Sequence, residues 1–262
     1  MSFNTITVET DARGVARLML NRPAKHNVLS GEMCDELAAA AAGLGADSRV
    51  RVVVLTGAGP SFCAGGDLDW MRAQFAATRD GRMAEARRLA AMLGALDSLP
   101  KPLVGRVNGA AFGGGVGLMS VCDAVVAVEG ARFALTETRL GIIPATIAPY
   151  VIARLGAGRA RAVFFSGRAF DAAEARDLGL VTRVVPADRL DTAVAAEVAP
   201  YFATAPGAVA RAKRLARSLG APIDDGIVEA TVAALADAWE SAEAQAGITA
   251  FLGKRPPPWA DG

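Results

Sequence analysis

Two glycine-rich turns and one carboxylate are the groups in this sequence that could do chemistry together. The turns, Ser61-Phe-Cys-Ala-Gly-Gly-Asp67 and Asn108-Gly-Ala-Ala-Phe-Gly-Gly-Gly-Val-Gly117, each follow an apolar strand-like run and precede a helix-like one. Glycine permits close backbone approach, and a helix start leaves N–H groups free. Either turn alone could serve packing only. Together they could aim two N–H groups at one point, as an enolate of a thioester requires, with Glu137 as the acid/base group.

The chain has a single histidine, His26, which limits the catalytic mechanisms that are possible. Ser-His-Asp and Cys-His mechanisms and histidine-rich metal sites all need a histidine, and His26 lies in a proline-containing loop where we expect it to be exposed. Acid/base work must therefore fall to a carboxylate. Cys34, Cys63 and Cys122 are far apart and form no Cys-x-x-Cys pair, so we expect three buried thiols and no metal site.

The composition narrows the class of protein. The chain has 262 residues, 52% of them hydrophobic, and 28 basic against 27 acidic residues. This balance gives no reason to expect a nucleic-acid partner, although Arg211, Lys213, Arg214 and Arg217 form a local basic cluster that we interpret as a solvated helix face. No run of 18 residues lacks a charge, and the first residues lack a secretory pattern, so we expect a cytoplasmic protein without a membrane partner.

The order of the expected elements indicates an α/β fold. A hairpin over 3–8 and 14–20 is followed by a helix capped by Ser30, and apolar runs at 50–55, 103–107 and 124–128 predict buried strands. Helices are expected from Leu68, over 82–97 and over 113–121. Because strands alternate with helices, the sheet should be largely parallel.

Helices dominate after Glu137. We expect an α/β core over residues 1–200 and a C-terminal helical region over 201–262 that caps the core or mediates assembly. Asp171, Asp188 and Asp224 are expected helix caps. The expected helices cover residues 146–155, 157–165, 171–178, 187–203, 207–219 and 224–245.

The apolar stripe Val228, Val232, Leu235 and Trp239 has two interpretations. It could pack on the core of its own chain, or it could form a contact between subunits. In the second case the tail would lie near a neighbour's binding pocket. The sequence leaves both open.

Neither glycine turn has the spacing of a Rossmann loop, and no Gly-Lys-Ser/Thr occurs. Instead the chain resembles the crotonase, or enoyl-CoA hydratase/isomerase, family over its whole length. The resemblance is carried by the following segments: Leu20-Asn-Arg-Pro-Ala-Lys-His-Asn-Val-Leu29, Val53-Val-Leu-Thr-Gly57 with Phe62-Cys-Ala-Gly-Gly-Asp67, Lys101-Pro through Cys122-Asp123, Phe133-Ala-Leu-Thr-Glu-Thr-Arg-Leu-Gly141, and Thr249-Ala-Phe251 through Lys254-Arg255. It implies a ββα spiral core with a C-terminal helical cap.

The resemblance also implies roles for individual residues. The family's oxyanion hole falls on the N–H groups of Gly66 and Gly114, and its second catalytic glutamate falls on Glu137. The first glutamate of two-glutamate hydratases falls on Gly117 and is therefore absent. Coenzyme A, as part of the substrate rather than a separate cofactor, would be held near the following residues: Lys25, Ala64, Asp67, Leu68, Phe251 and Lys254.

Within the family, the chain is most similar to bacterial 3-methylglutaconyl-CoA hydratases and to isohexenylglutaconyl-CoA hydratases. The carrying segments are Gly66-Asp-Leu-Asp-Trp-Met71, Arg106 through Leu118, Phe133-Ala-Leu-Thr-Glu137 and Ile143-Pro-Ala-Thr-Ile-Ala-Pro-Tyr-Val151. The resemblance implies hydration of a branched enoyl-CoA with a second carboxylate, for which Arg72 and Arg139 are the nearest cations, although each is also typical of a surface ion pair.

Other activities stay open at this point. A generic short-chain hydratase or isomerase, a hydroxyacyl-CoA hydrolase and a crotonase that binds acyl-CoA without turnover are all compatible with one glutamate. The resemblance further implies a homotrimer or homohexamer.

Overall fold

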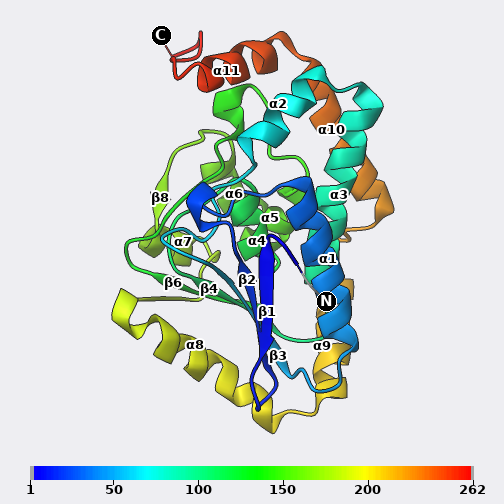
Figure 1. Ribbon diagram of the computed structural model, residues 1–262, viewed down its shortest axis with the longest axis vertical. Coiled ribbons are helices and arrows are strands. Elements are labelled where there is room, and N and C mark those ends of the chain that lie inside the picture. The colour runs from blue at the N-terminus through cyan, green and yellow to red at the C-terminus, as the bar shows by residue number, and fades with distance from the viewer. Residues whose placement is uncertain (1–2, 261–262) are drawn as a thin grey trace.

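The computed structural model describes residues 3–260, and a six-stranded sheet is its largest feature (Figure 1). The strand order is β1-β2-β3-β4-β6-β9. The hairpin pair β1 and β2 is antiparallel, and every other neighbouring pair is parallel, which confirms the largely parallel sheet. The strands are β1 (Ile6–Thr10), β2 (Val15–Leu20), β3 (Val52–Gly57), β4 (Leu103–Val107), β6 (Ala124–Val128) and β9 (Arg183–Val185).

The helices follow the predicted order. Ser30 caps α1 by accepting from the N–H of Met33, as expected for a serine at this position. Asp171 and Asp224 likewise cap α7 and α10. The helices are α1 (Gly31–Ala46), α2 (Leu68–Ala76), α3 (Arg79–Asp97), α4 (Gly114–Ser120), α5 (Ala148–Leu155), α6 (Ala157–Phe164), α7 (Ala172–Asp177), α8 (Leu190–Val198), α9 (Pro206–Leu219), α10 (Asp225–Glu240) and α11 (Ala242–Leu252).

Both faces of the sheet are covered, which explains why its central strands are apolar without alternation. Figure 1 shows α8 (yellow) on one side of the strands and α1 and α3 on the other. Successive side chains of a strand point to opposite faces. Those facing α8 are Val52, Val54, Val104 and Val126, and those in the larger core beneath α1 and α3 include Val53, Leu55, Val125 and Ala127.

A second, three-stranded sheet stands next to the glycine turns. Its order is β5 (Ala111–Phe112), β7 (Arg132–Ala134) and β8 (Phe170–Asp171). These strands and β9 were not predicted from the sequence. Each has two or three residues, too few for a hydrophobic period to show.

Two of the predicted helices are wrong in detail. The stretch 224–245 is not one helix, because Ser241 is extended (ψ 150°) and its side chain caps α11. The stretch 187–203 contains α8 flanked by two 3₁₀ turns, Ala187–Arg189 and Ala199–Ala203. Asp188 lies inside the first of these turns, so it is not a helix cap.

The C-terminal helices fold back over the chain's own core. In Figure 1, α10 runs beside α3. Side chains of α2 and α11 belong to one apolar cluster that includes Met71 and Ile248. Arg87 binds Glu229 across the α3–α10 contact, and Val232 and Trp239 are buried. The apolar stripe of α10 therefore packs within the chain, the first of the two interpretations. In the described part of the chain, no helix combines the length and the apolarity needed to cross a bilayer.

Candidate active site

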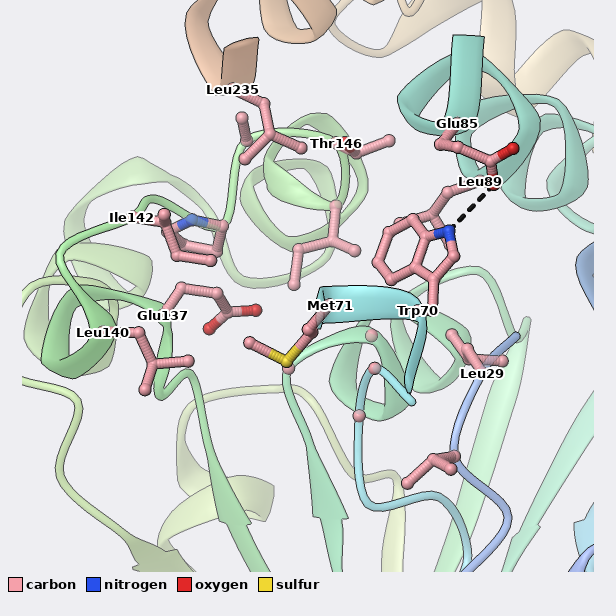
Figure 2. Close-up of a pocket in the computed structure, with 18 of the residues that line it drawn as sticks. Leu29, Trp70, Met71, Glu85, Leu89, Glu137, Leu140, Ile142, Thr146 and Leu235 are labelled. Carbon is pink, nitrogen blue, oxygen red and sulfur yellow. Dashed lines mark hydrogen bonds between the residues drawn. The ribbon is translucent and has the colours of Figure 1, made fainter. Parts of the chain in front are cut away.

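The carboxylate of Glu137 is held over a glycine that leaves room for it. Glu137 begins the 3₁₀ turn η2 (Glu137–Leu140), just after β7. A Cβ on Gly113 would lie 2.8 Å from Glu137 Oε1, so a larger residue there would displace the carboxylate, and the φ of +48° at Gly113 also favours glycine. Figure 2 shows the carboxylate pointing into the cavity. Its Oε2 is buried without a hydrogen-bond partner among the described residues, and burial raises the pKa of Glu137 to about 7.

The amides of Gly66 and Gly114 are left free by the hydrogen bonds around them. Leu29 N–H donates to Gly65 O (2.7 Å) and Asp67 N–H donates to Leu29 O (2.8 Å), so this bridge uses the carbonyl of Gly65 and the N–H of Asp67 but not the N–H of Gly66. Gly114 is the first residue of α4, where an N–H has no partner within the helix. Since the carboxylate of Glu137 lies against Gly113, the N–H of Gly114 belongs to the residue that follows this contact in the chain.

One cavity of about 320 Å³ joins these groups. Its walls are largely apolar, and they come from segments far apart in the sequence, including α1, α2, α3, α10 and α11 (Figure 2). Glu137, Gly66 and Gly114 all line it. Its other lining residues include Ala64, Leu68, Trp70, Glu85, Arg88, Thr146, Ile147, Leu235, Trp239 and Phe251.

The space that the side chain of a second catalytic glutamate at position 117 would need is occupied by Ile147. A Cβ on Gly117 would lie 2.6 Å from Cγ2 and 3.0 Å from Cβ of Ile147, which also lines the cavity. The site therefore has an isoleucine where a side chain at Gly117 would enter. Glu85, the other glutamate in the cavity wall, is already engaged, because it accepts from Trp70 Nε1 (2.8 Å) and from Arg88.

The residues predicted to hold coenzyme A divide into two groups. Ala64, Leu68 and Phe251 line the cavity. The other predicted residues, Lys25, Asp67 and Lys254, do not line it. Phe251 belongs to the same chain as Glu137, so the structure does not need a neighbour's tail to supply it.

The side chains of Lys25 and Asp67 have structural partners instead. Asp67 caps α2 through the N–H of Asp69 and accepts from Arg22 Nη2 (2.6 Å). Burial opposes ionisation of Asp67, but the hydrogen bond and charge of Arg22 outweigh it and hold the pKa of this carboxyl below its usual value. Lys25 Nζ lies 3.0 Å from Asp69 on the surface. His26 is exposed, as predicted.

Comparison with known proteins assigns the family. The sequence profile described as enoyl-CoA hydratase/isomerase matches residues 10–262. The chain belongs to the enoyl-CoA hydratase/isomerase family. A Thermus thermophilus protein named for enoyl-CoA hydratase activity is 37% identical over 256 residues, which are 95% of this chain and 99% of the relative.

Solved structures of the enoyl-CoA hydratase/isomerase family agree over nearly the whole chain. An enoyl-CoA hydratase from Mycobacterium avium has a TM-score of 0.85 at 31% identity, covering 98% of this chain and 99% of its own. Pseudomonas aeruginosa AtuE has a TM-score of 0.81 at 37% identity, and the match covers 98% of this chain and 100% of AtuE. The expected crotonase fold is therefore confirmed.

In this enoyl-CoA hydratase/isomerase, neither arginine suggested for a substrate carboxylate reaches the cavity. Arg72 pairs with Asp69 (3.1 Å) on the surface, and Arg139 is exposed. The cation that lines the cavity is Arg88, which the sequence analysis missed. Its spacing to Glu85 on an expected helix was visible in the sequence, but nothing local indicated that this face of α3 borders a cavity.

The guanidinium of Arg88 is already paired. Nη1 donates to both oxygens of Glu85 (2.8 and 3.0 Å), and Nε lies 3.1 Å from Asp35 Oδ1. One positive charge faces two negative ones, so Arg88 is not a free anion-binding group. The three cysteines are buried thiols, as predicted, and burial raises the pKa of each to about 12.

Proposed function

We propose that this protein hydrates α,β-unsaturated acyl-CoA thioesters with Glu137 as its single acid/base residue. The observation that carries the proposal is the buried Glu137 carboxylate, which lies against Gly113 and is raised in pKa to about 7. A general base works best when its pKa is near the working pH.

The reaction needs one carboxylate if both proton transfers occur on the same face. Glu137 removes a proton from water as the water oxygen attacks C3, and the electron pair of the double bond moves onto the thioester oxygen. The N–H groups of Gly66 and Gly114 stabilise this enolate, and one such donor is typically worth about 3–4 kcal/mol of barrier. Glu137 then returns the proton to C2.

For the substrate we propose 3-methylglutaconyl-CoA or a similar branched, carboxylated enoyl-CoA. The resemblance of Ile143 through Val151 to hydratases of such substrates supports this choice. The apolar walls of the cavity suit the branched carbon skeleton, and Thr146 is a polar group in its wall.

Double-bond isomerisation is the second candidate, favoured by the single carboxylate and the apolar walls, which give water few partners. The two reactions differ in product. Incubation of crotonyl-CoA and 3-methylglutaconyl-CoA with the enzyme, followed by NMR in D₂O, distinguishes a 3-hydroxyacyl product from a shifted double bond. Release of free coenzyme A instead would identify a hydrolase.

Glu137→Gln tests the role of the carboxylate. We expect kcat to fall by roughly a hundredfold or more, the scale of a lost acid/base group, with unchanged circular dichroism. Glu85→Gln is the matched comparison, because Glu85 lines the same cavity but is already paired. Glu85→Gln should lower kcat by no more than a few fold. Near wild-type turnover by Glu137→Gln would refute the single-glutamate mechanism.

A further inference from the structure

Two buried side-chain oxygens lack a hydrogen-bond partner in residues 3–260, and the residues that carry them, Glu137 and Thr146, both line one cavity. One is Glu137 Oε2, which the proposed reaction uses. The other is Thr146 Oγ1, whose residue is 3% exposed. Buried hydroxyls are nearly always bonded, so an unpartnered one in the wall of a binding cavity indicates a ligand atom that completes it.

Thr146 stands apart from the reacting carboxylate. In Figure 2 it lies between Glu137 on one side and Trp70 and Glu85 on the other, close to the α3 side of the cavity. An acyl chain whose C2 and C3 face Glu137 would extend towards it. The surrounding wall is apolar, with Leu89, Ile147 and Leu235 among its residues, so any polar atom of the acyl chain has few other partners there.

The charged groups of the cavity do not offer that partner. Arg88 donates to both oxygens of Glu85 and pairs with Asp35. An anion brought to this cluster would meet one positive and two negative charges, whereas a neutral hydroxyl can donate to a carboxylate oxygen without an opposing charge.

We infer that Thr146 is a specificity-determining residue, whose Oγ1–H donates a hydrogen bond to an acceptor oxygen carried by the acyl group beyond C3. The inference rests on the proposed function for the direction in which the acyl chain lies. It assigns to the cavity a substrate with a distal carboxylate or carbonyl oxygen. A site built to bond such an oxygen discriminates against an analogue that lacks it.

The test compares two thioesters of the same shape. In 3,5-dimethylhex-2-enoyl-CoA an isopropyl group replaces the carboxylate of 3-methylglutaconyl-CoA. We expect Thr146→Val to lower kcat/KM for the carboxylated thioester by about tenfold or more relative to the apolar one, as for the loss of a hydrogen bond to a charged group. Thr146→Ser, which keeps the hydroxyl, should retain the wild-type ratio.

A matched control is available in the fold. Thr56 is also buried, but its Oγ1 donates to Arg106 O (2.9 Å) and it does not line the cavity. Thr56→Val should lower stability and leave the substrate ratio unchanged. Thr146→Val should not be less stable than the wild type, because it removes an unbonded hydroxyl.

Binding separates failure of this inference from failure of the proposed function. Dissociation constants of the saturated thioesters 3-methylglutaryl-CoA and 3,5-dimethylhexanoyl-CoA, measured by calorimetry, do not depend on turnover. A tenfold change in their ratio on Thr146→Val supports the inference even if the enzyme does not hydrate. An unchanged ratio, or an equal loss on both thioesters, overturns it, and the equal loss would instead indicate a role in holding water.

Discussion

Glu137 should make this enzyme sensitive to pH near neutrality. Its pKa is raised to about 7 by burial, and only the ionised form can accept a proton from water. We therefore expect kcat/KM for hydration to rise as pH increases through about 7 and then to level off. A pH profile with crotonyl-CoA measures this. A rising limb centred near the ordinary carboxyl value of 4.5 would contradict the burial of Glu137.

The same shift predicts an effect on stability. Because the folded pKa exceeds the unfolded value of 4.5, the stabilising contribution of neutral Glu137 is complete below pH 4.5 and is lost as pH rises through about 7. The free energy of unfolding of Glu137→Gln should equal that of the wild type at pH 4. Above pH 7 it should exceed the wild-type value by up to about 3 kcal/mol. Urea denaturation at the two pH values measures the difference.

Two glycines that line the cavity make a matched pair of substitutions. A Cβ on Gly113 would lie 2.8 Å from Glu137 Oε1, and φ there is +48°, whereas a Cβ on Gly66 would meet nothing closer than Trp70 at 3.7 Å. Gly113→Ala should displace the carboxylate and lower kcat at least tenfold, while Gly66→Ala should keep kcat within a few fold. Equal effects of the two would show that the position of the carboxylate is not limiting.

At the scale of elements, the contact between α4 and the segment before α5 decides that the site has one carboxylate. Ile147 occupies the direction that a side chain at Gly117 would take. Gly117→Glu should therefore destabilise the fold by several kcal/mol, through overpacking and a buried charge, and should not raise activity. Adding Ile147→Gly, which removes both clashing atoms, should recover part of the stability.

Gly130→Glu is the control for this substitution, since a Cβ at Gly130 meets nothing within 4 Å. Its denaturation midpoint should equal that of the wild type. A Gly117→Glu variant as stable as this control would mean that Ile147 moves freely.

The C-terminal helix α11 packs directly against the turn that carries Glu137. Gly141 and Gly247 let α11 approach η2 closely, because a Cβ on Gly247 would lie 2.6 Å from Leu140 O, and a Cβ on Gly141 would lie 2.4 Å from Glu243 O. Since η2 begins with Glu137, the last helix supports the turn that carries the carboxylate.

At the scale of the whole molecule, α9 differs from the other α-helices of residues 3–260 in its exposure. None of its residues is buried, and Leu215 and Leu219 are 60% and 79% exposed. Lys213 and Arg217 of the basic cluster pair with Asp123 and Asp97, so the cluster is not wholly a solvated face.

We expect a trimer or hexamer in solution, in which a second copy covers this apolar edge. Light scattering at micromolar concentration measures the assembly, and Leu215→Ser with Leu219→Ser should shift it towards smaller species. Because Phe251 lines the cavity of its own chain, these variants should keep acyl-CoA affinity. A stable, active wild-type monomer would rule out the assembly.

The sequence by itself determined the features that rest on local pattern. Long apolar periods and caps such as Ser30 and Asp224 located most helices and the central strands, because these signals act within one segment. The glycine turns were recognisable for the same reason, whereas the role of Glu137 followed from the resemblance to the crotonase family. The structure brings Gly66, Gly114 and Glu137 to one cavity.

Tertiary structure alone decided what depends on contact between distant segments. The two- and three-residue strands exist only through their partners, and Ser241 divides a stretch whose pattern reads as one helix. Arg88 of α3 borders the cavity and Arg72 of α2 does not, and Ile147 fills the space at Gly117 from thirty residues away. Such packing is set by the shape and burial of neighbours, which no local pattern records.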